Sequence, residues 1–94
     1  MQFNRRLSDF IVARDMYLKG LILEVEGRMH EAIDFFIKSI SKSQDFTTAY
    51  AHLLRIAQNW ADVDMGAAKE LLQRLDRARP GQPRVRELLE RYFY

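Results

Sequence analysis

The side chains in this sequence that could do chemistry are few, and they lack the spacings of catalytic or metal sites. There is no cysteine, which excludes disulfides, thiolate metal sites and cysteine nucleophiles. The histidines, His30 and His52, do not make a set of metal ligands. The serines lack the Gly-x-Ser-x-Gly turn of a hydrolase, and no glycine-rich phosphate loop is present. Asp62 and Asp64 resemble the start of a calcium loop whose later ligands are missing. The sequence therefore predicts a protein that is not an enzyme and that has no cofactor or metal ion.

Length and composition fit one small domain. The chain has 94 residues, of which 48% are hydrophobic, so we expect one modest core and a single domain over residues 1–94. No apolar run approaches the roughly 20 residues that span a bilayer, and residues 1–10 lack the apolar core of a signal peptide. We therefore expect a soluble, cytoplasmic protein that does not contact a membrane.

The net charge is small and its excess is local. It is +2, with seven basic and seven acidic side chains in residues 1–47 and eight against six in residues 48–94. Arginines crowd around the Pro-Gly pair at 80–81, at positions 74, 77, 79, 84 and 86. They could bind an anionic partner. Alternatively, they could interact favourably with the negative C-terminal end of a helix dipole, which is the simpler interpretation.

Apolar residues recur at helical spacing almost throughout, and no stretch alternates with a period of two. The apolar positions between Phe3 and Val25 predict one long first helix with a single apolar face. Gly27 is suited to end that helix, because a helix C-terminus favours a residue that tolerates positive φ. A second helix is expected up to about Ser43.

Three further helices follow from capping signals. Asp45 or Thr47 can cap a third helix that runs to about residue 60, and Asp64 can cap a fourth, because their side-chain oxygens accept from free backbone amides. The Pro-Gly pair at 80–81 ends the fourth helix. Pro83 is suited to the first turn of a fifth helix, where its missing amide hydrogen would be unpaired anyway.

Two segments 36 residues apart, residues 31–38 and 67–74, place small and large apolar residues in the same register. A repeat of this length indicates stacked helical hairpins. Gly20, Gly27, Ala32 and Phe36 stand at the spacing of the tetratricopeptide repeat, and the chain resembles that family over roughly residues 13–80. In this resemblance Gly20 and Ala32 permit close approach of two helices, while Phe36 fills the space between hairpins.

The resemblance is degenerate, with about two repeats and a closing helix. In the second repeat Leu54 replaces the usual close-contact glycine, and the turn around residues 60–64 is two residues longer. The resemblance implies an all-α fold of about five helices, in which antiparallel hairpins stack as a short right-handed α-solenoid. Hairpin one would cover about 5–43, hairpin two about 46–79 and the closing helix about 83–93. The alternative is an antiparallel helical bundle without this stacking.

The resemblance also implies a binding surface, because the first helix of each hairpin lines the concave face of such an array. Carried over residue by residue, it selects eleven positions: Arg14, Tyr17, Leu21, Glu24, Thr48, His52, Arg55, Asn59, Arg84, Glu87 and Arg91. These residues would form a cradle for a peptide or helix of another protein, and their arginines favour an acidic partner. Tyr17 and Leu21 could instead belong to the core.

A second candidate surface is the aromatic end formed by Trp60, Tyr92, Phe93 and Tyr94, through which we expect a homodimer. The leading functional hypothesis is a non-catalytic adaptor or scaffold. One alternative is a small helical chaperone or assembly factor that shields one client protein. Another is a nucleic-acid-associated protein, which the mixed charges between residues 74 and 91 make unlikely.

Overall fold

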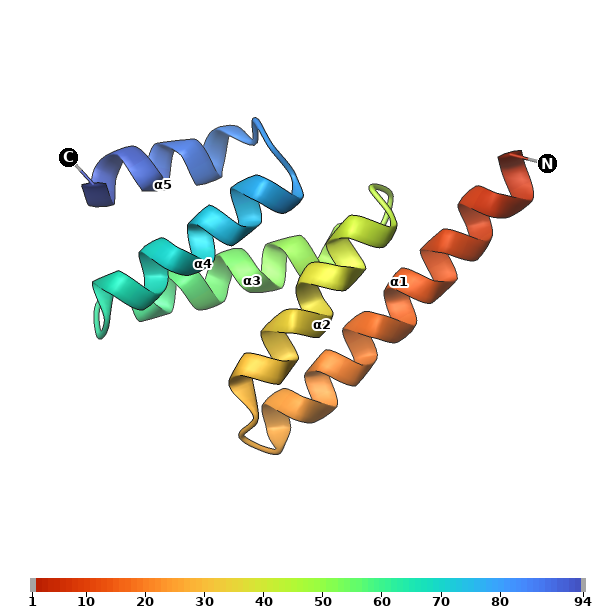
Figure 1. The fold of residues 1–94 in the computed structure, drawn as a ribbon, viewed down its shortest axis with the longest axis horizontal. Coiled ribbons are helices and arrows are strands. Elements are labelled where there is room, and N and C mark those ends of the chain that lie inside the picture. The colour runs from red at the N-terminus through yellow and green to blue at the C-terminus, as the bar shows by residue number, and fades with distance from the viewer. Residues whose placement is uncertain (1, 94) are drawn as a thin grey trace. The chain divides into compact units, whose positions relative to one another are not determined.

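The computed structural model describes residues 2–93, with side chains from 4 to 92, and in this range the chain is helical without any strand. Its five helices are α1 (Gln2–Val25), α2 (Met29–Lys42), α3 (Thr48–Trp60), α4 (Met65–Ala78) and α5 (Pro83–Phe93) (Figure 1). The all-α class and the five helices are confirmed. The chain divides into two units, Met1–Ala49 and Tyr50–Tyr94, and the boundary falls in the first turn of α3.

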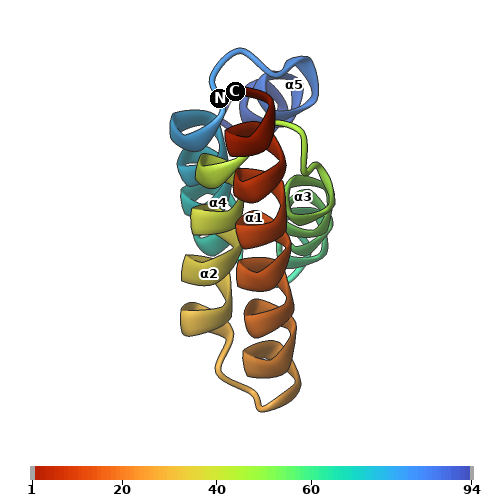
Figure 2. The same ribbon diagram turned by 90° about the vertical axis from the view of Figure 1, so that its right-hand side faces the viewer.

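The first unit is built on the antiparallel hairpin of α1 and α2, which lie side by side (Figures 1 and 2). We call the end of the hairpin away from its connecting turn, where α1 begins and α2 ends, the open end. Small residues at the helix crossing allow this approach, since Ala13 and Ala32 are fully buried. The Phe36 ring lies on Gly20, where any side chain would collide with it. The Ser39 hydroxyl donates a buried hydrogen bond of 2.7 Å to the carbonyl oxygen of Ala13 and ties the two helices together.

The turn of this hairpin follows a known pattern of helix termination. Gly27 has φ 82°, as its position after the helix predicts, and its amide donates to the carbonyl of Glu24 at 3.0 Å. The amide of Arg28 reaches back to the carbonyl of Leu23 at 2.9 Å. Together these two bonds make a Schellman motif, which satisfies carbonyls that the end of α1 would leave free.

Apolar residues of α1 occupy two faces of the helix, not the single face that their spacing predicts. Ala13 and Gly20 are buried toward α2. Five large aliphatic side chains are exposed: Leu7, Ile11, Leu18, Ile22 and Val25. At 3.6 residues per turn these five lie within about 60° of one another, roughly opposite Ala13 and Gly20. We call them the outer face of α1.

The segment between α2 and α3 returns to α1. Phe46 is buried, and its ring lies 5.4 Å from that of Phe10 and 5.6 Å from that of Tyr17. Asp45 accepts two hydrogen bonds from Arg6, so this residue joins α1 and does not cap α3. Thr47, the other predicted cap, immediately precedes the first residue of α3.

In the second unit, α3 and α4 are joined by the short turn 61–64. Asp64 caps α4 as predicted, since its carboxylate accepts from the amide of Ala67 at 3.0 Å. The guanidinium of Arg79, just after α4, lies 5.7 Å from the centre of the Tyr50 ring near the start of α3. The beginning of α3 is therefore next to the end of α4, as in an antiparallel pair.

The last helix, α5, packs against α4. Gly81 has φ 80° and lies between the two helices, while Pro83 is the first residue of α5, as predicted. Val85 and Leu88 are buried. These features form the fifth helix that the sequence predicts after the Pro-Gly pair.

Candidate protein-binding surface

The candidate residues on α1 form one row along the helix. Arg14, Tyr17, Leu21 and Glu24 follow each other at spacings of three and four, so they share one side of α1. The Arg14 side chain is 53% exposed and its guanidinium lies 3.5 Å from the carboxylate of Asp15. The other three side chains are half-buried. This row borders the outer face of α1.

Tyr17 is mainly a packing residue of the first unit. Its ring centre lies 5.4 Å from that of Phe36 and 5.6 Å from that of Phe46, in tilted arrangements that favour aromatic pairs. A ligand on this row would therefore meet the edge of a tyrosine that is already held in place by the core. The accessible chemistry of the row comes chiefly from Arg14, Leu21 and Glu24.

The candidate residues on α3 form a second row, at spacings of four, three and four. Thr48, Arg55 and Asn59 are exposed, and His52 is half-buried. Nη2 of Arg55 lies 3.0 Å from Nδ1 of His52. A guanidinium only donates hydrogen bonds, so Nδ1 must be the acceptor and the neutral imidazole carries its proton on Nε2. His52 therefore presents an N–H donor on its other edge.

The candidate residues on α5 form a third row, linked by ion pairs. The carboxylate of Glu87 lies 3.2 Å from Nη1 of Arg84 and 3.3 Å from Nη2 of Arg91. One carboxylate is shared by two arginines one turn away on either side, and all three side chains are exposed. The row keeps a net positive charge, with two guanidinium groups beside one carboxylate.

The eleven candidate residues thus form three rows, one in the first unit, one that begins at the unit boundary and one in the second unit. Each row has the spacing of one helix side, and each is open to solvent over at least part of its length. The set contains four arginines and two glutamates, so its net positive charge favours an acidic ligand. That the three rows form one concave surface remains a prediction.

Other arginines of the cluster around the Pro-Gly pair take part in contacts within the second unit. Arg79 lies over the Tyr50 ring, and Arg86 lies 4.0 Å from the carboxylate of Asp76. The hydroxyl of Tyr50 and one carboxylate oxygen of Asp76 are buried without a hydrogen-bond partner in the described part of the chain. Burial, the largest influence, and the charge of Asp76 raise the pKa of Tyr50, while Arg79 lowers it.

The predicted aromatic end is described only in part. Trp60 and Tyr92 are half-buried. Tyr94 and the side chain of Phe93 lie outside the described residues. A homodimer through these four residues remains a prediction.

The outer face of α1 is the surface that sequence reasoning missed. The spacing of apolar residues predicts a single face that also holds Phe10 and Tyr17, although a helical wheel places these two to one side of the exposed residues. The signal was present in the number of apolar positions, because one helix face packed on one neighbour cannot use all of them. Val25 and Ile22 are the most exposed, at 89% and 61%.

Within the described residues, no group of three or more His, Asp or Glu side chains is placed to hold a metal ion. Over the same range, none of the helices has both the length and the apolar character needed to cross a bilayer. Comparisons with protein-family models, with curated proteins and with solved structures found no match to this chain.

Proposed function

We propose that this chain is a non-catalytic protein-interaction module of the tetratricopeptide type, which binds a peptide or helix of an acidic partner protein. The observation that carries this proposal is the set of three solvent-accessible rows on α1, α3 and α5. Four arginines belong to them, and the side chains of Arg14, Arg84 and Arg91 are 53%, 46% and 61% exposed. Arginines in ordered rows can pair with carboxylates through two parallel hydrogen bonds.

The packing of the first hairpin supports the family assignment within this proposal. The small residues Gly20 and Ala32 are buried where α1 and α2 cross, and Gly27 ends α1 with positive φ. Phe36 is fully buried against Gly20. These are the four residues that carry the resemblance, and their packing in the first hairpin supports the assignment. The role of Phe36 between hairpins is part of the proposal.

The proposal is tested by affinity capture from extract of the native cells. The test variant is Arg55→Glu/Arg84→Glu, which reverses charge in the rows on α3 and α5. The control is Arg77→Glu/Lys38→Glu, which makes the same change of charge at two exposed positions outside the rows. Circular dichroism first establishes that all three proteins are equally helical.

We expect wild type and control to capture the same partner and the test variant to lose it, with a loss of affinity of about tenfold or more, since each arginine–carboxylate pair contributes about 1.5–3 kcal/mol. A partner that binds all three proteins equally would place binding outside these rows. Turnover of a substrate by the purified protein would overturn the non-catalytic assignment.

A further inference from the structure

The outer face of α1 is a row of exposed apolar side chains on a helix whose opposite side is already packed. Its five side chains, from Leu7 to Val25, are between 40% and 89% exposed. At 1.5 Å per residue they extend over about 27 Å of helix. An apolar strip of this length is what one helix presents to another, and it costs solubility if it stays in water.

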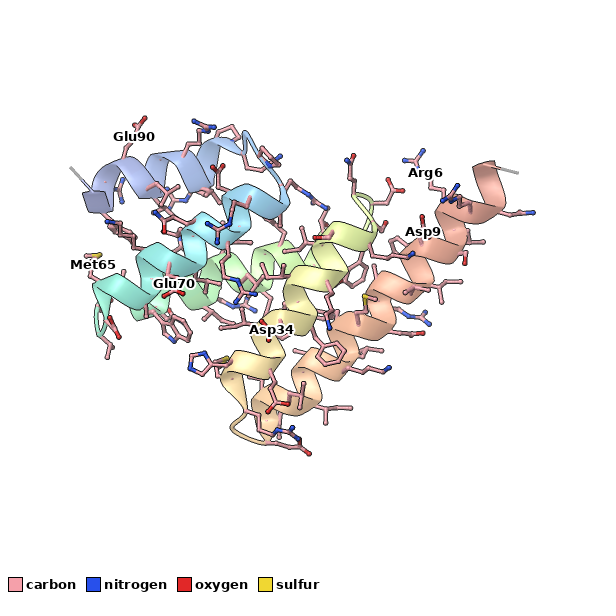
Figure 3. All side chains as sticks on the ribbon, in the orientation of Figure 1. Arg6, Asp9, Asp34, Met65, Glu70 and Glu90 are labelled. Atoms are coloured by element: carbon pink, nitrogen blue, oxygen red, sulfur yellow. The ribbon has the colours of Figure 1, made fainter. Side chains whose placement is uncertain are left out.

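The charges of the same unit are divided along the axis of the hairpin. Residues 2–14 and 35–49, at the open end, carry five basic and two acidic side chains, a net charge of +3. Residues 15–34, next to the turn, carry two basic and five acidic side chains, a net charge of −3. Figure 3 shows Arg6 and Asp9 at the open end and Asp34 nearer the turn. The hairpin is thus positive at one end and negative at the other.

We propose that the occupant of the outer face is a second copy of this chain, paired antiparallel through α1 about a two-fold axis. Two copies in this orientation place the positive end of each hairpin beside the negative end of the other. The helix dipoles are then also opposed, which is favourable. A parallel pair would place like ends together, so the charge pattern selects the antiparallel one.

The spacing of the apolar residues is self-complementary in the same orientation. With the axis at residue 16, Leu7 faces Val25 of the second copy, Ile11 faces its half-buried Leu21, and Arg14 faces its Leu18. These are the positions that pair across an antiparallel helix seam with a seven-residue repeat. Leu7 and Val25 of the two copies therefore cover each other, and Leu21 covers Ile11 of the second copy.

The charged residues nearest the axis are paired within each copy. Arg14 and Asp15 border the outer face on its two sides and lie 3.5 Å apart as an ion pair. In the antiparallel pairing each Arg14 faces Leu18 of the second copy and keeps Asp15 of its own chain as its ion-pair partner. A parallel pairing would instead set Arg14 against Arg14.

Sedimentation equilibrium of the full chain, at concentrations between about 1 μM and about 1 mM, tests the association. We expect the mass to rise from the 11.2 kDa of one chain toward twice that value. Ile22→Glu, in the strip, should weaken association at least tenfold. The matched control is Val63→Glu, which puts the same charge on an 88%-exposed valine in the turn before α4 and should leave association unchanged.

Orientation is tested by single cysteines, because the natural chain has none. In the antiparallel pair, residue 7 of one copy lies beside residue 25 of the other, within reach of a disulfide, while the two residues 7 are about 27 Å apart. A mixture of Leu7→Cys and Val25→Cys should therefore form the mixed disulfide in a glutathione buffer. Each variant alone should stay reduced.

Three outcomes would overturn the proposal: a monomer at every concentration, association that Ile22→Glu leaves unchanged, or disulfides within Leu7→Cys alone and Val25→Cys alone. A monomer would leave the strip to a different protein. Association that survives Ile22→Glu would direct attention to the aromatic end. Arg14 and Leu21 belong both to the candidate row on α1 and to this seam. The capture experiment changes Arg55 on α3 and Arg84 on α5, which are not part of the seam, so its result is independent of these.

Discussion

Gly20 lies directly beneath the ring of Phe36, so close that a Cβ atom at residue 20 would be 2.7 Å from Cδ1 and 3.1 Å from Cζ of that ring. The optimal separation of two carbon atoms that are not bonded is about 3.5–4.0 Å. Phe36 is fully buried and cannot turn away into solvent. The approach of α1 to α2 therefore depends on the absence of a side chain at residue 20.

Gly20→Ala should lower the free energy of unfolding by about 2 kcal/mol. The clash with a buried ring belongs to the upper end of overpacking costs, about 3 kcal/mol, and the higher helix propensity of alanine offsets about 1 kcal/mol. Urea unfolding followed by circular dichroism measures the difference. Gly66→Ala is the matched control, since a Cβ there meets only Asp64 Oδ1 at 3.5 Å, and it should be neutral or stabilising.

Adding Phe36→Leu to Gly20→Ala should lower the free energy of unfolding by less than the sum of the two single changes. Simple additivity of the two changes would show that the ring is not the obstacle.

Ser39→Ala should lower the free energy of unfolding by about 1 kcal/mol. Its hydroxyl makes a buried 2.7 Å hydrogen bond to the carbonyl of Ala13, and one such bond has about this net value. Ser41→Ala, at an exposed position on the same helix, should change stability little. Equal effects at the two positions would mean that the bond between α1 and α2 contributes nothing net. Chemical denaturation of both variants beside wild type gives the comparison.

The elements that could be predicted from the sequence are those whose causes are local. Gly27 at the end of α1, Asp64 before α4 and Pro83 at the start of α5 act within one helical turn, and the structure places all three as expected. A cap needs only a side-chain oxygen or a tolerated φ next to the free backbone groups. Such features depend on only three or four consecutive residues.

The features that could not be predicted depend on residues far apart in the chain. The sequence offers Asp45 as a possible cap for α3, but this residue pairs with Arg6, 39 positions earlier, because the segment after α2 returns to α1. Periodicity located the helix α1 correctly, yet it could not say which of two apolar faces meets α2. That choice is made by Gly20 and Ala13, which let α2 approach on their side. The outer face is left over from this choice.

The pairing of Arg6 with Asp45 should appear in the acid titration of the protein. The hydrogen bond from Arg6, and secondarily its charge, hold the pKa of Asp45 below the 3.8 of an isolated aspartate. Because the folded pKa is the lower one, the contribution of Asp45 to stability is present above pH 3.8 and is lost as the pH falls through its folded pKa. Carboxyl ¹³C titration should show a lower pKa for Asp45 in wild type than in Arg6→Gln.

Wild type should also lose slightly more stability on acidification below about pH 4 than Arg6→Gln does. The effect is small, because both side chains are solvent-exposed and screened by salt. The same Asp45 pKa in both proteins would show that the ion pair does not persist in solution.

Asp64→Ala should destabilise the protein by about 1 kcal/mol, the usual value of an N-cap. The carboxylate accepts from the amide of Ala67, which has no partner inside α4, and its negative charge also suits the positive end of the helix. Asp64→Ser keeps the acceptor and should retain most of the stability. Asp62→Ala, two residues earlier and exposed, removes the same charge without removing a cap and is the control. If Asp62→Ala were as costly as Asp64→Ala, the contribution would be one of charge alone. If only Asp64→Ala is costly, amide exchange at Ala67 and Ala68 should rise in that variant, because the first turn of α4 then opens more easily.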